Sequence, residues 1–402
     1  MIIDSKSTSS RETESKQFFE TTLISAETAG FLLIGDWGDD QNIEHVKKVA
    51  DAMNIQATAR NSSAVIALGD NFYAGGRYDY EGVKAIDDVK FETLWADIYN
   101  GSAIESLPWY VVLGNHDWYT NDSNTFEMLY DSSKWQIPDF FYTKRFQIQT
   151  STSLFNASFI FIETDLLFYG YQQGSEAIPA NFAKLGWSAA NATVEKQLAW
   201  IDRALAEANN DQYVFLLGHH PTFTCVSHVL ESVNMLSVLE LVNKWKISAF
   251  VNGHQHSLAY YYTNDNNTLQ IQSGAGGTSL ALPCAPVNSS APGKELAQTY
   301  GFSHLELSSS AAIFDFVDEN SNTVFSASVS PRRPVDVKVN CEFLTSACDS
   351  SIHFKRALGD TCANIPAIDG FLCYSNDSAK NSEVLLAVSI GIICVSFVVW
   401  KI

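Results

Sequence analysis

The chain has 402 residues, 46% of them hydrophobic and 12% aromatic, which is enough to bury one large core or two smaller ones and argues against general disorder. The formal net charge is −20 and no run of five or more basic residues occurs, which argues against nucleic acid as a partner. An anionic substrate would need local positive charge, such as metal ions, to overcome the field of so acidic a molecule.

The N-terminal segment, residues 1–28, is polar, and we expect it to be disordered. It lacks the apolar stretch of a secretory signal. Because other features of the chain favour a secretory route, we expect a truncated or alternative start.

Residues 29–333 alternate short apolar runs with helical patterns, which predicts an α/β catalytic domain with a sheet covered by helices. Leu198, Ile201 and Leu205 show the helical spacing at three- and four-residue steps. The expected helices cover residues 40–53, 86–99, 191–208 and 229–244. A later stretch without helical patterns is expected to complete a second sheet, with strands at 269–273, 302–307, 312–317 and 324–329.

Five segments of this domain each consist of an apolar run, a glycine and then a side chain that can bind metal. They cover residues 31–38, 64–73, 110–117, 214–221 and 249–256. Each run has the length of a fully buried strand. Because open α/β sheets bind ligands at the carboxyl ends of their strands, we expect the five polar turns to form one active-site edge.

Asp70 is the strongest single candidate ligand, since one carboxylate commonly bridges the two ions of a two-metal site. Asp36, His254 and His256 supply further candidates. Taken singly, a Gly-Asp pair is often only a turn after a strand, and a lone histidine is often structural. Five such segments in this order favour a dinuclear metallohydrolase instead.

The C-terminal part begins with a cysteine-containing stalk, residues 334–383, in which four cysteines without a Cys-x-x-Cys pair favour two disulfides over a zinc site. The seven cysteines of the chain are Cys225, Cys284, Cys341, Cys348, Cys362, Cys373 and Cys394. Pairing of Cys225 with Cys284 stays open. Asn-x-Ser/Thr sites favour a glycoprotein on the secretory route over an Asn- and Ser-rich cytosolic protein; they stand at Asn61, Asn100, Asn121, Asn156, Asn191, Asn266, Asn288 and Asn376.

An uncharged apolar segment, residues 384–400, lies close to the C-terminus and has about the minimum length for crossing a bilayer. It fits a transmembrane helix or a cleaved signal for a glycolipid anchor near residues 375–378. The spacer to the apolar segment is short for an anchor signal, so we favour the helix and expect membrane attachment through this segment.

The five segments read GDWG, GDNFY, GNHDWY, GHHP and GHQH at their polar ends. In this the chain resembles the small purple acid phosphatases of the tartrate-resistant type, over about residues 30–333. The most discriminating feature is Tyr73 combined with Gly38, because other metallophosphoesterases place a metal-binding histidine where Gly38 stands. The resemblance implies a calcineurin-like fold, a two-sheet β sandwich flanked by helices.

By that resemblance the metal ligands form two sets that share Asp70. Ferric iron would be held by Asp36, Asp70, Tyr73 and His256. A second ion, Fe²⁺, Zn²⁺ or Mn²⁺, would be held by Asp70, Asn115, His219 and His254. His116 and His228 correspond to the family's two catalytic histidines beside the metals, and a tyrosinate bound to Fe³⁺ gives the family its purple colour.

The charge of such a centre explains how an acidic protein attracts phosphate. A trivalent and a divalent ion bring ~+5, and two carboxylates with one phenolate bring ~−3, so about +2 remains. The resemblance implies hydrolysis of phosphate monoesters, such as phosphoproteins, nucleotides or small phosphoesters, by a metal-bound hydroxide. His116 and His228 would stabilise the phosphoryl oxygens or protonate the leaving group.

We therefore predict a membrane-anchored acid phosphatase with an extracellular or lumenal catalytic domain. Two alternatives stay open: a phosphodiesterase or nucleotide pyrophosphatase on the same fold, and a surface-anchored binding protein that has lost catalysis. The natural substrate, the second metal and the oligomeric state are not predicted.

Overall fold

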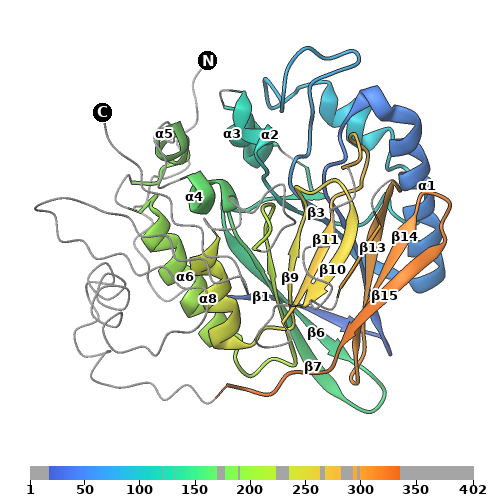
Figure 1. The fold of residues 1–402 in the computed structure, drawn as a ribbon, viewed down its shortest axis with the longest axis vertical. Coiled ribbons are helices and arrows are strands. Elements are labelled where there is room, and N and C mark those ends of the chain that lie inside the picture. Colours follow the sequence, from blue (N-terminus) through green and yellow to red (C-terminus); the bar gives the residue numbers. More distant parts are fainter. Residues whose placement is uncertain are drawn as a thin grey trace, which may run out of the picture. The chain divides into compact units, whose positions relative to one another are not determined.

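The computed structural model describes residues 18–120, 122–130, 132–169, 177–188, 191–222, 235–262, 268–281, 293–296 and 299–335. The chain divides into two units, Met1–Val335 and Asp336–Ile402, and only the first contains described residues. Figure 1 shows this unit as two β-sheets with helices on their outer sides.

The first sheet has the strand order β15-β14-β13-β2-β3-β4-β5. Its strands are β2 (Ala29–Ile34), β3 (Ser62–Leu68), β4 (Trp109–Val112), β5 (Trp135–Gln136), β13 (Gly301–Leu307), β14 (Ala312–Asp318) and β15 (Thr323–Val329). β2 to β5 are parallel, and β13 joins the free side of β2 in antiparallel register, with Ser303 opposite Leu33.

The second sheet has the order β1-β6-β7-β8-β9-β11-β10-β12. Its strands are β1 (Glu20–Ser25), β6 (Tyr142–Gln149), β7 (Leu154–Phe161), β8 (Tyr213–Leu217), β9 (Ala249–Asn252), β10 (Leu258–Tyr262), β11 (Leu269–Ser273) and β12 (Gly293–Leu296). The central strands β7, β8, β9 and β11 run parallel.

The hydrophobic core lies between the two sheets and holds side chains of both. The Phe31 ring of β2 lies 4.8 Å from the ring of Phe146 and 5.0 Å from that of Phe159. Phe215 of β8 meets Phe314 of β14 edge to face, with ring centroids 5.8 Å apart. The predicted two-sheet sandwich is therefore confirmed.

Helices cover the outer faces, which is why central strands such as β2 and β8 are apolar and buried on both sides. α1 (Ile43–Arg60) packs on the first sheet, and α6 (Val194–Glu207) packs on β7 and against α8 (Leu236–Trp245). Figure 1 shows α1 on one side of the sandwich and α6 and α8 on the other. Four shorter helices are α2 (His116–Tyr119), α3 (Ser123–Leu129), α4 (Thr164–Tyr169) and α5 (Ala177–Lys184).

The helix boundaries differ from prediction in two places. α1 runs on to Arg60, beyond the predicted end at residue 53, and stops where Asn61 adopts a left-handed conformation with φ 48°. The predicted helix 86–99 contains only a six-residue π-helix, η2 (Phe91–Ala96). α6 lies within its predicted range of 191–208, and the hydroxyl of its N-cap residue, Thr193, accepts a hydrogen bond from the Lys196 amide.

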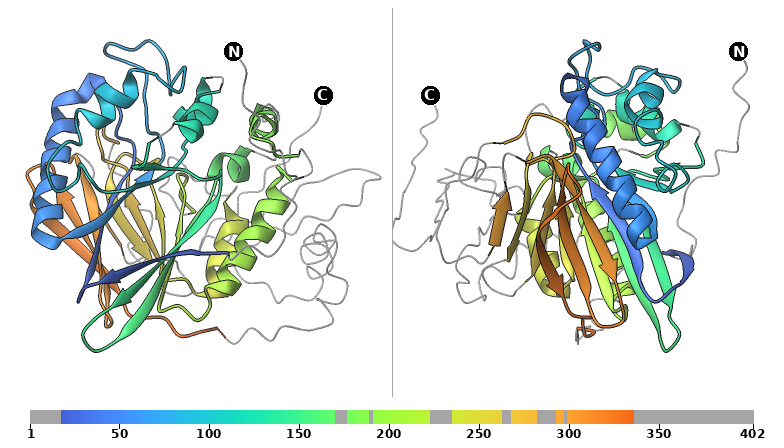
Figure 2. Two further views of the ribbon diagram at one scale, coloured as in Figure 1. Left: turned by 180° about the vertical axis from the view of Figure 1, so that it is seen from behind. Right: turned by 90° about the vertical axis from the view of Figure 1, so that its right-hand side faces the viewer.

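The prediction that residues 1–28 are disordered is wrong for its last part, because β1 pairs in parallel with β6 along its whole length. Figure 2 shows β1 in dark blue at the edge of the sheet, next to the hairpin of β6 and β7, in which β6 is its partner. Phe19 anchors this strand: its side chain is only 2% exposed and lies 4.3 Å from the Arg145 guanidinium. The polar sequence did not indicate this strand, because β1 pairs through its backbone and buries few of its own side chains.

The prediction that the late strands together complete a second sheet also needs correction. β11 lies between β9 and β10 in the eight-stranded sheet, whereas β13, β14 and β15 extend the sheet of β2. The late strands therefore complete both sheets. Sequence patterns predict strands but carry little information about which edge accepts them.

The predictions for the C-terminus are not tested by the described residues. Residues 336–402, with the apolar segment 384–400 and nearly all of the stalk, lie outside them, as do all seven cysteines. Within the described parts of the chain, no helix has both the length and the apolarity to cross a membrane.

Candidate metal centre

The five predicted segments meet at one edge of the sandwich. β2, β3 and β4 end just before Asp36, Asp70 and Asn115, and β8 and β9 end just before His219 and His254. Since these strands are parallel within each sheet, their carboxyl ends bring the polar turns together. Direct contacts between side chains connect all seven predicted metal ligands.

The first group of contacts surrounds the Tyr73 hydroxyl, which lies 3.1 Å from Asp36 Oδ1 and 2.9 Å from Asp70 Oδ2. His256 Nε2 lies 3.5 Å from Asp36 Oδ1. One possible ligand atom each from Asp36, Asp70 and His256 lie within 4.8 Å of one another. Both carboxylates are fully buried, so this is a desolvated cluster of hard oxygen donors.

The second group surrounds Asn115 Oδ1, which lies 3.1 Å from His219 Nε2 and 3.1 Å from His254 Nδ1. His219 Nε2 is also 3.3 Å from Asp70 Oδ2. Asp70 therefore touches Tyr73 on one side and His219 on the other, the position that a bridging carboxylate requires. Side chains converge here from the ends of four strands, β3 and β4 of the first sheet and β8 and β9 of the second.

Backbone carbonyls orient two of the histidine rings. His219 Nδ1 lies 2.9 Å from Leu68 O, and His256 Nδ1 lies 2.7 Å from Ser279 O. A carbonyl only accepts, so each Nδ1 donates a proton, and each Nε2 faces the carboxylates, where it can carry a second proton or bind a metal ion. A hydrogen bond of this kind to the far ring nitrogen is usual for metal-ligating histidine.

Backbone strain coincides with the predicted ligands. Asp36, Asp70 and His254 have φ values of 60°, 51° and 67°, a left-handed conformation that non-glycine residues rarely adopt. Close packing also requires a glycine at position 114, where an added Cβ would lie 2.4 Å from Asp70 Oδ1. The turns thus hold the carboxylates in positions that cost free energy, as functional sites often do.

Of the two predicted catalytic histidines, the structure describes His116 but not His228. His116 lies beside the cluster, with its amide donating to Asp70 Oδ1 (2.8 Å) and its Nε2 3.9 Å from Asp70 Oδ2. Its Nδ1 lies 2.9 Å from Glu81 Oε2, so the carboxylate accepts the Nδ1 proton and Nε2 faces the site. His228 lies outside the described residues, so its role stays a prediction.

The charged side chains of the cluster shift one another's pKa values. Burial opposes protonation of His219, but the Asp70 carboxylate outweighs it and raises the pKa of His219 to about 10. Burial likewise opposes ionisation of Asp70, and the neighbouring His219 and His116 nevertheless hold the pKa of Asp70 well below its usual range. A proton on His219 thus occupies the place of a cation, and metal binding would release it.

Sequence reasoning missed two acidic residues that support the site. Asp117 is fully buried and accepts from the amides of Asn71 (2.9 Å) and Gly114 (2.9 Å), which fixes the second and third turns together. Burial, together with the charge of Asp70, raises the pKa of Asp117 to about 7. Asp117 was open to prediction, because it stands inside the GNHDWY segment. The second residue is Glu81, the partner of His116, and it stands in none of the five segments.

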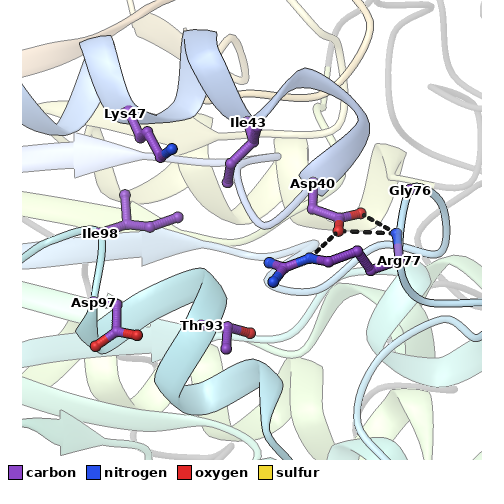
Figure 3. Close-up of a pocket in the computed structure, with 8 residues that line it drawn as sticks. All are labelled: Asp40, Ile43, Lys47, Gly76, Arg77, Thr93, Asp97 and Ile98. Atoms are coloured by element: carbon purple, nitrogen blue, oxygen red, sulfur yellow. Dashed lines mark hydrogen bonds and ion pairs between the residues drawn. The ribbon is translucent and has the colours of Figure 1, made fainter.

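A cavity of about 470 Å³ lies outside this cluster. Figure 3 shows its walls, which include Asp40, Lys47, Arg77 and Thr93 and none of the predicted metal ligands. It is an open surface hollow of mixed charge. The candidate metal centre is therefore formed by converging polar side chains and does not coincide with this cavity.

Comparison with known proteins places this geometry in a family. Residues 30–258 match the calcineurin-like phosphoesterase family. The chain belongs to that family. A tartrate-resistant acid phosphatase type 5 from Mus musculus is 28% identical over 76% of this chain and 91% of its own length, and the Homo sapiens protein of that name is 27% identical over 75% and 91%. Purple acid phosphatase 7 of Arabidopsis thaliana is 25% identical over 75% of this chain and 86% of its own.

Two solved calcineurin-like structures share the fold. One, titled "GAP50 the anchor in the inner membrane complex of Plasmodium", has a TM-score of 0.63 at 20% identity and covers 80% of this chain and 95% of its own. The purple acid phosphatase PPD1 of yellow lupin has a TM-score of 0.54 at 15% identity, covering 76% and 54%. The predicted resemblance is confirmed, and family and relatives together support a metal-dependent phosphatase.

Proposed function

We propose that this protein is an acid phosphatase that hydrolyses phosphate monoesters at a dinuclear centre of ferric iron and a divalent ion. The observation that carries the proposal is the Tyr73 hydroxyl held between the Asp36 and Asp70 carboxylates. Burial, together with those two charges, raises the pKa of Tyr73 well above its ordinary value. Three acidic groups facing one another in a buried place fit a highly charged cation better than any other partner.

The two groups of contacts favour different ions. Asp36, Asp70 and Tyr73 offer oxygen donors with one histidine, a set suited to Fe³⁺. Around Asn115, two histidines join an amide oxygen and the shared Asp70, a set suited to Fe²⁺, Zn²⁺ or Mn²⁺. Two ions bound in this way would supply Lewis-acid charge for the phosphoryl oxygens and an activated water as nucleophile.

The exposure of the side chains around the centre indicates the side from which substrate approaches. His116 and His256 keep 24% and 25% of their side chains exposed, whereas Asp36, Asp70 and His219 are fully buried. Substrate therefore approaches from the side of His116 and His256. His116 presents Nε2 there, because Nδ1 donates to Glu81, and in the protonated ring Nε2 can donate to a phosphoryl oxygen or to the leaving group.

We also propose that the catalytic domain works outside the cytosol, in an extracellular or lumenal place, with the apolar segment 384–400 as its attachment to the membrane. The support is the set of Asn-x-Ser/Thr sites and the cysteine pattern. Of these sites, Asn61, Asn100 and Asn191 are exposed.

A binding protein without catalysis is the second candidate, because a solved structure of the same fold is titled an anchor. The complete set of ligand side chains favours catalysis here. An enzyme that prefers phosphodiesters is the remaining alternative, and it differs in substrate rather than in the site.

The deciding experiment is the visible spectrum of the protein expressed through a secretory pathway, with Tyr73→Phe as the matched variant. We expect a purple band that disappears in the variant, together with turnover of p-nitrophenyl phosphate that exceeds turnover of bis-p-nitrophenyl phosphate. A colourless protein with two bound metals and faster diester turnover would indicate the phosphodiesterase. A metal-free, inactive wild-type protein would indicate the binding protein.

A further inference from the structure

Lys90 is a lysine with no exposed surface, and its ammonium group is fully engaged. Nζ donates to three backbone carbonyls, those of Tyr73 (2.9 Å), Tyr80 (2.6 Å) and Gly82 (2.8 Å). An ammonium has three protons, so each finds one acceptor. Nζ also lies 4.1 Å from the centroid of the Tyr80 ring, a favourable cation–π distance.

Such burial needs a reason, because lysine is almost never fully buried and its desolvation is costly. Lys90 stands directly before the π-helix η2, an irregular element that is frequent at functional sites. The next residue, Phe91, is fixed by stacking on Tyr130 at 3.8 Å and by an edge contact with Phe72 at 5.2 Å. Lys90 therefore extends to the carbonyls from a backbone position that the packing of Phe91 holds in place.

The three carbonyls belong to one loop, residues 73–82, and this loop carries two groups of the candidate centre. Its first residue is Tyr73, whose hydroxyl lies between the two carboxylates. Near its end is Glu81, whose Oε2 accepts from His116 Nδ1 (2.9 Å) and from the Ala74 amide (2.8 Å). The Lys90 contacts are at Tyr73 itself and at both neighbours of Glu81.

The outer tip of the same loop is held separately. Asp40 accepts from the Arg77 amide and from Arg77 Nε, both at 2.9 Å, on the wall of the surface hollow in Figure 3. The Arg77 side chain is 61% exposed, so this contact lies at the surface. The tip is thus held at the surface, whereas Lys90 binds the two ends of the loop that carry Tyr73 and Glu81.

We propose that Lys90 is a positioning residue: its ammonium fixes the 73–82 loop so that the Tyr73 hydroxyl and the Glu81–His116 pair face the metal centre. This inference rests on the proposed function, because it takes Tyr73 as a metal ligand and His116 as a proton donor. A backbone shift of about 1 Å at such groups can cost about 100-fold in rate.

The test compares Lys90→Met with Lys144→Met. Lys144 is also buried, with 7% of its side chain exposed, but it lies on β6, a strand that carries no predicted site residue, and pairs with Glu20 of β1. We expect Lys90→Met to keep two metals per chain but to shift the purple band and to lower kcat roughly 10- to 100-fold, with KM changed less than about 3-fold. Lys144→Met should keep the wild-type band and kcat.

Hydrogen exchange of the metal-free proteins supplies a second readout, with faster exchange expected across residues 73–82 in the Lys90 variant only. If Lys90→Met does not fold, Lys90→Gln replaces it, since the amide keeps two donors for the three carbonyls. A folded Lys90 variant with the wild-type band, kcat and exchange would overturn the inference. Absence of the band and of turnover in the wild-type protein would instead contradict the proposed function.

Discussion

Asp70 is the residue on which the whole centre depends, because its Oδ2 contacts both Tyr73 and His219. We predict that Asp70→Asn binds neither ion at full occupancy, whereas His256→Gln mainly empties the site around Tyr73. The reason is that the shared carboxylate supplies charge to both ions and His256 contacts only the Asp36 side. Elemental analysis after gel filtration measures the metal content, with Asp202→Asn on α6 as control.

Equal metal loss in Asp70→Asn and His256→Gln would contradict the assignment of Asp70 to both groups. Asp36, Asp70, His254 and His256 were open to prediction as candidate ligands because each follows a glycine at a strand end, whereas Tyr73, Asn115 and His219 were assigned by the family resemblance. Glu81 and Lys90 were not predicted. Glu81 lies in a loop without regular structure, and Lys90 acts on backbone carbonyls, which leave no mark on the sequence of their own residues.

At the scale of elements, β1 shows why an ordered strand escaped prediction. Its side chains are mostly exposed or half-buried, so the strand depends on the anchor that precedes it. We predict that Phe19→Ala lowers the free energy of unfolding by about 3 kcal/mol, since removal of a buried phenyl ring typically costs this much. Leu23→Ala on the same strand, where the side chain is 60% exposed, should cost less than about 0.5 kcal/mol.

Urea unfolding of both variants measures the difference, and equal losses would show that β1 is not anchored through Phe19. The contrast also marks the limit of pattern-based prediction. The strands β2, β3, β8 and β9 were predictable because continuous apolar runs report burial directly. β1 has no such run, and its partner β6 lies more than a hundred residues later in the chain.

His304 of β13 gives the sheet of β2 a dependence on pH. It is fully buried, with Nε2 3.2 Å from Ser62 Oγ and Nδ1 3.2 Å from Arg60 Nη1. Burial, together with the Arg60 charge, lowers the pKa of His304 from 6.5 to about 3. Between these values the unfolded chain binds a proton that the folded chain does not, so stability is complete above pH 6.5 and falls as the pH drops toward 3.

We predict that His304→Gln removes up to about 3 kcal/mol of the stability difference between pH 7 and pH 4, by loss of that titration. Urea midpoints at the two pH values measure it. Ser62→Ala is the control, since it removes a hydrogen-bond partner but no titrating group and should shift both midpoints alike. An unchanged pH dependence in His304→Gln would refute the assignment.

For the molecule as a whole, the packing of the two sheets determines where the candidate ligands meet and which asparagines are exposed. Two sheets that pack face to face bring the ends of β2, β3 and β4 against those of β8 and β9, so neither sheet alone holds both groups of ligands. The strongly acidic surface then leaves the metal ions as the source of attraction for phosphate. The same packing decides which surface asparagines are free for modification.

Secretion with N-glycosylation should therefore be selective. We predict glycans at the exposed Asn61, Asn100 and Asn191 but none at Asn156, although all four stand in Asn-x-Ser/Thr sites. Asn156 lies within β7, where its Nδ2 donates to Asp211 Oδ1 (3.1 Å), and a sugar on that nitrogen would break the contact. Mass spectrometry after enzymatic deglycosylation in heavy-oxygen water maps the occupied sites. A glycan on Asn156 in folded, active protein would contradict the packing of β7, whereas a secreted protein without any glycan would contradict the predicted modification of the exposed Asn61, Asn100 and Asn191.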